Sequence, residues 1–175
     1  MSILNEFTST QLRQALGNRV LTLPVLAINA AAAATIRTTN AVVFSLDGQI
    51  YTRAALAAVA LAVNTTLQQK TTYQQGFYVQ PVSTTVYYTV VLSTSSGTVN
   101  VIQGTYLNQP FQGAGANFGT GEIPDPDDYA FVAIGGIKIV TNSATTFTPG
   151  TTALDAAGLT VTYRDYNGMV PAVAW

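Results

Sequence analysis

The only dense group of charged side chains in this sequence is acidic: Glu122, Asp125, Asp127 and Asp128. Carboxylates crowded in a loop can coordinate Ca²⁺, which takes oxygen ligands. An EF-hand loop that began at Asp125 would need glycine at position 130 and glutamate at position 136, but the chain has Ala130 and Gly136 there. An irregular calcium site stays open, and a polar turn stiffened by prolines is the favoured interpretation.

Other groups that catalyse reactions are scarce. The chain has no histidine and no cysteine, so a serine or threonine nucleophile has no imidazole base, and Lys70 and Lys138 stand in no Ser-x-x-Lys pattern. Spacing singles out no carboxylate pair for glycoside hydrolysis. The glycines at 113, 115, 119 and 121 fail as a dinucleotide fingerprint, because its third glycine would fall on Phe118 and no helix pattern follows. We expect a protein that is not an enzyme and needs no cofactor.

Low charge indicates what kind of partner the chain has. Only 9% of its residues are charged, the net charge is −1, and the seven basic residues are scattered. No basic stripe neutralises phosphates, so we expect no nucleic-acid binding. No apolar run reaches membrane-spanning length, so we expect no membrane partner. Few charges protect the surface from association, which predicts that other subunits cover it and that the chain is a homo-oligomer.

Residues 1–35 differ from the rest and are predicted to be an N-terminal arm. Thr8 or Ser9 can cap a short helix over residues 10–16, which Gly17 would end. This helix is too short to be stable alone, and the apolar run at 20–28 is interpreted as an extended arm on a neighbour. A secretion signal is the disfavoured alternative, because Glu6 and Pro24 interrupt its pattern. The apolar residues predicted to contact a partner are Leu12, Leu16, Val20 and Leu23.

Residues 36–175 have the pattern of a β domain. Two alternating segments, 41–46 and 49–53, flank Asp47-Gly48, which is a two-residue hairpin signal. The alanine-rich segment 54–63 is ambiguous, and a strand from about Val59 is preferred. Further strands are expected at 76–80, 84–92, 98–102, 129–141 with a kink at Gly135-Gly136, and 158–164. The sequence predicts a mainly β fold, an antiparallel β-sandwich or jelly-roll-like body.

The last eight residues form an apolar tail that contains Met169 and ends on the only tryptophan, Trp175. A terminal segment is usually polar and mobile unless something holds it. Because a buried tryptophan can anchor an interface, we expect Met169 and Trp175 to dock on a neighbouring subunit, with docking on the chain's own sheet as the alternative.

Four segments carry a resemblance to a known group of proteins: residues 47–55, 80–88, 130–140 and 147–155. Together they resemble small β-rich virion proteins of tailed bacteriophages, of the capsid cement or decoration type. The resemblance implies a β-sandwich, often a trimer, that bridges neighbouring major capsid proteins and stabilises the head. It supplies no active-site residues. The alternative is a tail, baseplate or fibre component that binds a receptor or a glycan.

Overall fold

The computed structural model describes residues 17–46, 49–61, 79–93, 99–104, 131–167, 170–171 and 175. These residues contain strands, turns and irregular segments but no helix, so the described part of the chain is mainly β, as predicted. The strands are β1 (Arg19–Val20), β2 (Leu26–Ile28), β3 (Thr35–Thr38), β4 (Val42–Leu46), β5 (Gln49–Arg53), β6 (Val59–Ala60), β7 (Thr85–Ser93), β8 (Val99–Gln103), β9 (Phe131–Thr141) and β10 (Leu159–Asp165).

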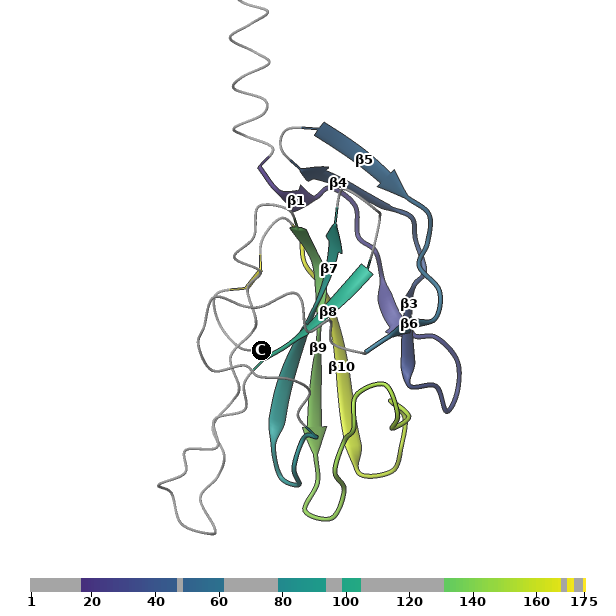
Figure 1. Cartoon of the computed structure of the whole chain (residues 1–175), viewed down its shortest axis with the longest axis vertical. Helices are drawn as coiled ribbons and strands as arrows, with labels where there is room; N and C mark the ends of the chain where they lie inside the picture. The colour runs from purple at the N-terminus through teal and green to yellow at the C-terminus, as the bar shows by residue number, and fades with distance from the viewer. Residues whose placement is uncertain are drawn as a thin grey trace, which may run out of the picture.

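The strands form three antiparallel sheets. The largest has the order β10-β9-β7-β8, and the two smaller sheets have the orders β1-β4-β5 and β2-β3-β6. In Figure 1 the β1-β4-β5 sheet lies at one end of the largest sheet, whereas β3 and β6 lie along its side. This arrangement is consistent with the predicted β-sandwich.

The pair β7–β9 forms the centre of the largest sheet. Both sequences alternate branched or aromatic residues on one face, which is the pattern of strands that cover a core. The alternate residues that face the core have no exposed surface: Val86, Tyr88, Val90 and Leu92 from β7, and Val132, Ile134, Ile137 and Ile139 from β9. Full burial of each such aliphatic side chain contributes about 1.5–3 kcal/mol.

A β-bulge interrupts the β7–β9 ladder. Val90 is opposite Gly135 and Val91 is opposite Ala133, so Ile134 is the extra residue on β9. The main-chain oxygen of Ile134 accepts a hydrogen bond of 3.2 Å from the amide of Tyr166, beyond the end of β10. This bulge lies next to the predicted kink at Gly135-Gly136. An extra residue on one strand bends that strand, which is the local effect that the kink prediction expects.

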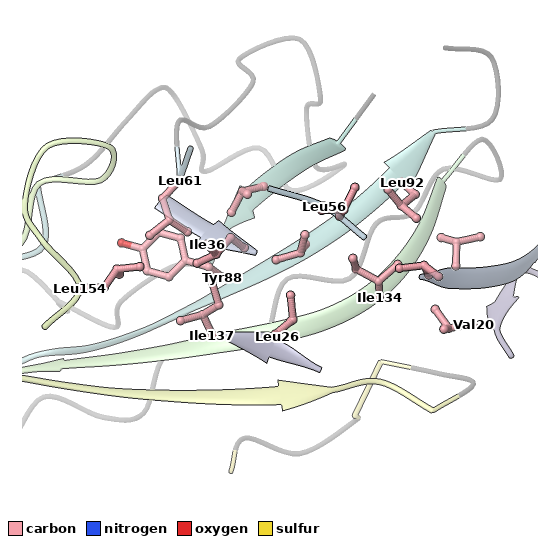
Figure 2. Close-up of a cluster of buried hydrophobic side chains, with 14 of the residues drawn as sticks. Val20, Leu26, Ile36, Leu56, Leu61, Tyr88, Leu92, Ile134, Ile137 and Leu154 are labelled. Atoms are coloured by element: carbon pink, nitrogen blue, oxygen red, sulfur yellow. The ribbon is translucent and has the colours of Figure 1, made fainter. Parts of the chain in front are cut away.

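The two smaller sheets complete the hydrophobic core. Figure 2 shows Val20, Leu26 and Ile36 directed toward Tyr88, Ile134 and Ile137 of the largest sheet. Val20 and Leu26 are only 2% and 6% exposed. The described part of the predicted arm, residues 17–35, is thus built into the body, because β1 pairs with β4 and β2 pairs with β3. The expected helix over residues 10–16 lies outside the described residues.

The strand predictions for the body are confirmed for five segments, which form β4, β5, β7, β9 and β10, and for the described part of the segment that forms β8, whereas the segment 76–80 differs. In the predicted hairpin, Leu46 of β4 is opposite Gln49 of β5, so the two strands pair in the expected register, whereas Asp47 and Gly48 lie outside the described residues. The segment 76–80 is described only at its end, where Gln80 forms an isolated bridge with Phe147 instead of a strand. Strands β7 to β10 begin and end within about two residues of their expected bounds, and β6 begins at Val59, as expected.

Gly135 is a position where any side chain would collide with the fold. A Cβ atom there would contact the Leu26 side chain and lie 2.8 Å from the main-chain oxygen of Arg164, which β9–β10 pairing holds in place. We predict that Gly135→Ala lowers the free energy of unfolding by about 1–3 kcal/mol, as overpacking does. Denaturant unfolding measures the change. The control Thr160→Ala, on the exposed face of β10, should stay within about 0.5 kcal/mol of wild type, and a Gly135→Ala variant as stable as this control would contradict the packing.

Tyr163 gives the fold an alkaline limit. Partial burial, and secondarily the charge of Asp155, raise the pKa of its hydroxyl from 10.0 to about 12. An unfolded chain releases this proton near pH 10 and the folded chain only near pH 12, so the stabilisation is complete below pH 10 and is lost as the pH rises to 12. We predict that Tyr163→Phe makes the fall in stability over that range shallower, as measured by denaturant unfolding at pH 9, 10, 11 and 12. Parallel curves for both proteins would contradict the prediction.

Candidate interface

Of the six residues predicted to contact a partner, the structure describes three. Leu12, Leu16 and Met169 lie outside the described residues. The prediction for Val20 is wrong: it is opposite Phe44 in the β1–β4 pair and faces the core. Leu23 is 53% exposed, and Trp175 is half-buried. The three described residues are therefore not one cluster, and of these three only Leu23 offers an open apolar surface.

Leu23 is the middle of three exposed apolar side chains between β1 and β2. Leu21, Leu23 and Val25 are 37%, 53% and 40% exposed, whereas the intervening Thr22 is half-buried and Pro24 is buried. We call Leu21, Leu23 and Val25 the apolar ridge. Large exposed apolar side chains that are neighbours in space mark interaction surfaces more often than scattered ones do.

Hydrogen bonds fix one end of the ridge to β4. The amide of Leu21 donates to the carbonyl oxygen of Val43 at 2.8 Å, and the amide of Val43 donates to the Thr22 hydroxyl at 2.9 Å. The same hydroxyl donates to the carbonyl oxygen of Ala41 at 3.3 Å. The extended course of β1 therefore continues through residue 22 with its main chain held on β4.

Two further groups of hydrogen bonds fix the other end of the ridge. The side-chain nitrogen of Asn40 donates a hydrogen bond to the main-chain oxygen of Leu23 at 3.2 Å, and the main-chain amide of Asn40 donates one to the main-chain oxygen of Pro24 at 3.1 Å. The carboxylate of Asp165, at the end of β10, accepts from the amides of Val25 at 3.1 Å and Leu26 at 3.0 Å. The ridge is thus rigid before it meets any partner, which lowers the entropy cost of binding.

Val25 has a strained backbone. Its φ is 56°, in the left-handed region that β-branched residues rarely adopt. Such strain costs about 1–3 kcal/mol, persists only when the surroundings enforce it, and is concentrated at functional sites. Here the Asp165 carboxylate bonds the Val25 amide in the strained conformation, and the side chain remains 40% exposed.

Trp175 docks on the chain's own sheet, which is the alternative to the expected docking on a neighbouring subunit. Its ring packs edge-on against Tyr87 with centroids 5.6 Å apart, and the Arg164 guanidinium lies 5.6 Å from its centroid. Its main-chain oxygen accepts hydrogen bonds from the Tyr87 hydroxyl at 2.7 Å and from Lys138 Nζ at 2.6 Å. These partners lie on the face of the β7–β9–β10 sheet away from the core. They bond the main-chain oxygen of Trp175, whereas its indole nitrogen is buried without a hydrogen-bond partner.

The described residues provide no metal centre. They contain no group of three or more acidic, histidine or cysteine side chains that could hold a metal ion. The acidic cluster of Asp125, Asp127 and Asp128 lies outside the described residues. Burial raises the pKa of the Tyr88 hydroxyl, which accepts a 3.1 Å hydrogen bond from Gln103 inside the core and so has a structural role. Within the same residues no helix is long and apolar enough to cross a membrane.

Comparison with known proteins gives no relative. No protein-family model and no curated protein match the sequence, and no solved structure matches the fold. Its exposed apolar side chains and hydrogen-bonded main chain make the apolar ridge the best-defined candidate for a functional surface in the described part of the chain.

The Asp165 carboxylate is expected to control the rigidity of the ridge. Asn at this position keeps one acceptor oxygen but directs an NH₂ group at the second amide, so one main-chain donor loses its partner. We predict that Asp165→Asn speeds hydrogen exchange of the Val25 and Leu26 amides at least tenfold, as measured by NMR.

A reciprocal variant serves as the control for this experiment. Asp155 accepts a 2.8 Å hydrogen bond from the amide of Ala32, which also has a positive φ of 56°. Asp155→Asn should speed exchange at Ala32 and leave Val25 and Leu26 unchanged. Equal effects of both variants at all three amides would show general destabilisation instead of local control.

Proposed function

We propose that this chain is a structural virion protein of a tailed bacteriophage, which stabilises the head by binding and bridging major capsid proteins. One observation carries the binding step: a pre-organised ridge of three exposed apolar side chains on a β body. The assignment to a virion rests on the resemblance of the four segments to phage structural proteins. The low charge of the chain, 9% of residues, suits a subunit whose surface is covered after assembly.

The mechanism requires only binding. A protein that binds the assembled shell and not its separated subunits stabilises the assembly by its binding free energy. Many copies act on one shell, so each contact can be modest while the total is large. The ridge supplies apolar area to each contact, and its fixed backbone limits the entropy lost on docking.

The ridge is tested by reconstitution on phage heads that lack this protein. We predict that Leu23→Ser weakens binding to such heads at least tenfold, because burying a leucine contributes about 1.5–3 kcal/mol and 1.4 kcal/mol is a tenfold change. Sedimentation of heads with bound protein gives the affinity. The matched control is Val79→Ser, which removes an apolar side chain that is 52% exposed outside the ridge and should bind as wild type does.

Two results of this experiment would overturn the proposal. Failure of the wild-type protein to bind heads would exclude a head protein, and equal weakening by Leu23→Ser and Val79→Ser would exclude the ridge. Copy number in purified particles gives a separate check. A number close to that of the major capsid protein supports the head, whereas a few copies per particle would indicate the tail or fibre alternative.

A further inference from the structure

Strand β5 has one open edge. It is the outer strand of the β1-β4-β5 sheet, and no other strand of the described residues pairs with its second edge. Figure 1 shows β5 at the outer margin of the molecule. Gln49, Ile50 and Thr52 are exposed, and Ile50 is 59% exposed. An edge strand of this kind, with no proline and a single charge, presents main-chain N–H and C=O groups to another strand.

Hydrogen bonds to β4 identify which residues of β5 face the open edge. The main-chain amide of Val43 donates a hydrogen bond to the Thr22 hydroxyl, and the carbonyl oxygen of Val43 accepts one from the Leu21 amide. Both polar groups of the Val43 main chain are therefore directed away from β5. Residues in an antiparallel pair alternate between hydrogen-bonded and non-hydrogen-bonded positions. Thr52, opposite Val43, and Ile50, two residues away, therefore direct their N–H and C=O groups outward.

We propose that the open edge of β5 pairs with β5 of a second copy of this chain, antiparallel and about a two-fold axis at Tyr51. In this register Ile50 of each copy is opposite Thr52 of the other. Each of these residues has one free N–H and one free C=O, so the pair of strands forms about four hydrogen bonds. The two small sheets become one continuous sheet of the order β1-β4-β5-β5-β4-β1.

Charge and side-chain placement favour a second copy over a foreign strand. The only charged residue of β5, Arg53, is opposite Gln49 of the second copy and never opposite itself, so no like charges meet. The net charge of −1 adds little repulsion between identical chains. The two Ile50 side chains lie diagonally across the new pair on one face, within reach of each other.

The position of Tyr51 also suits a two-fold axis. Its ring stacks on Phe44 with centroids 5.5 Å apart, and its hydroxyl donates to Gln49 of the same strand at 2.7 Å. Tyr51 is therefore already packed on its own sheet, and in the proposed pair it lies directly opposite Tyr51 of the second copy, on the same face as Phe44. An isologous contact of this type is closed, so it predicts a dimer and not the trimer that the resemblance implies.

The test is sedimentation velocity and light scattering of the full chain over a range of micromolar concentrations, with two variants. Thr52→Pro deletes an outward N–H without removing a hydrogen bond to β4, because proline is tolerated on an edge strand whose N–H faces solvent. Its matched control, Thr52→Val, keeps the N–H. We expect wild type and Thr52→Val to be dimers, and Thr52→Pro to dimerise at least tenfold more weakly.

Ile50→Lys keeps the test decisive if proline at position 52 disturbs folding, as circular dichroism would reveal. It places charge on the edge and should also weaken the dimer at least tenfold, whereas Val79→Lys, another exposed apolar position, should not.

A wild-type monomer at all concentrations would overturn the proposal and leave the edge to a foreign strand. An oligomer that persists in the Ile50→Lys variant would also overturn the proposal. So would an oligomer that is lost only in the Leu23→Ser variant, because this result would place the contact between subunits on the apolar ridge. Head binding is measured separately, so its failure does not bear on dimerisation.

Discussion

The core-facing side of the β7–β9 pair decides where everything else lies. Its eight fully buried side chains form one continuous apolar surface, and strands of both smaller sheets contribute residues to the same cluster. Sheets of three short strands depend on such packing, because small sheets are marginal in water. The hydrophobic effect thus holds the β1-β4-β5 sheet against β9, and this places the apolar ridge and the open edge of β5 on the outside.

Local patterns were sufficient for the long strands and insufficient for residues 17–35. The alternation in β7 and the Asp47-Gly48 signal before β5 each lie within a few neighbouring residues, so propensity and turn chemistry predict them. Strand β1 has two residues and β2 has three, and Pro24 lies between them. Segments this short are too brief to show the two-residue alternation of apolar and polar side chains that predicts a strand. They exist because β4 and β3 offer partners, and pairing of this kind is not encoded locally.

The candidate interface shows the same division. The sequence shows that Leu23 and Val20 are apolar, but the tertiary structure decides whether an apolar residue is buried or exposed. Leu23 is exposed, whereas Val20, three residues earlier, is buried in the core. The Asp165 carboxylate that bonds the Val25 amide is 140 residues away in the sequence. The only local signal for the ridge is the alternation of apolar residues at 21, 23 and 25 around a threonine and a proline, and this alternation lies within a longer apolar run.

The hydrogen bonds that shape the apolar ridge use none of its exposed side chains. Leu21, Leu23 and Val25 contribute main-chain atoms, and the side chains that hold them belong to Thr22, Asn40 and Asp165. Residues at 21 and 23 can therefore be exchanged during evolution with little effect on folding. In the proposed binding role, the residues that would set specificity are thus separate from those that set stability, so one β body could follow a partner whose surface changes.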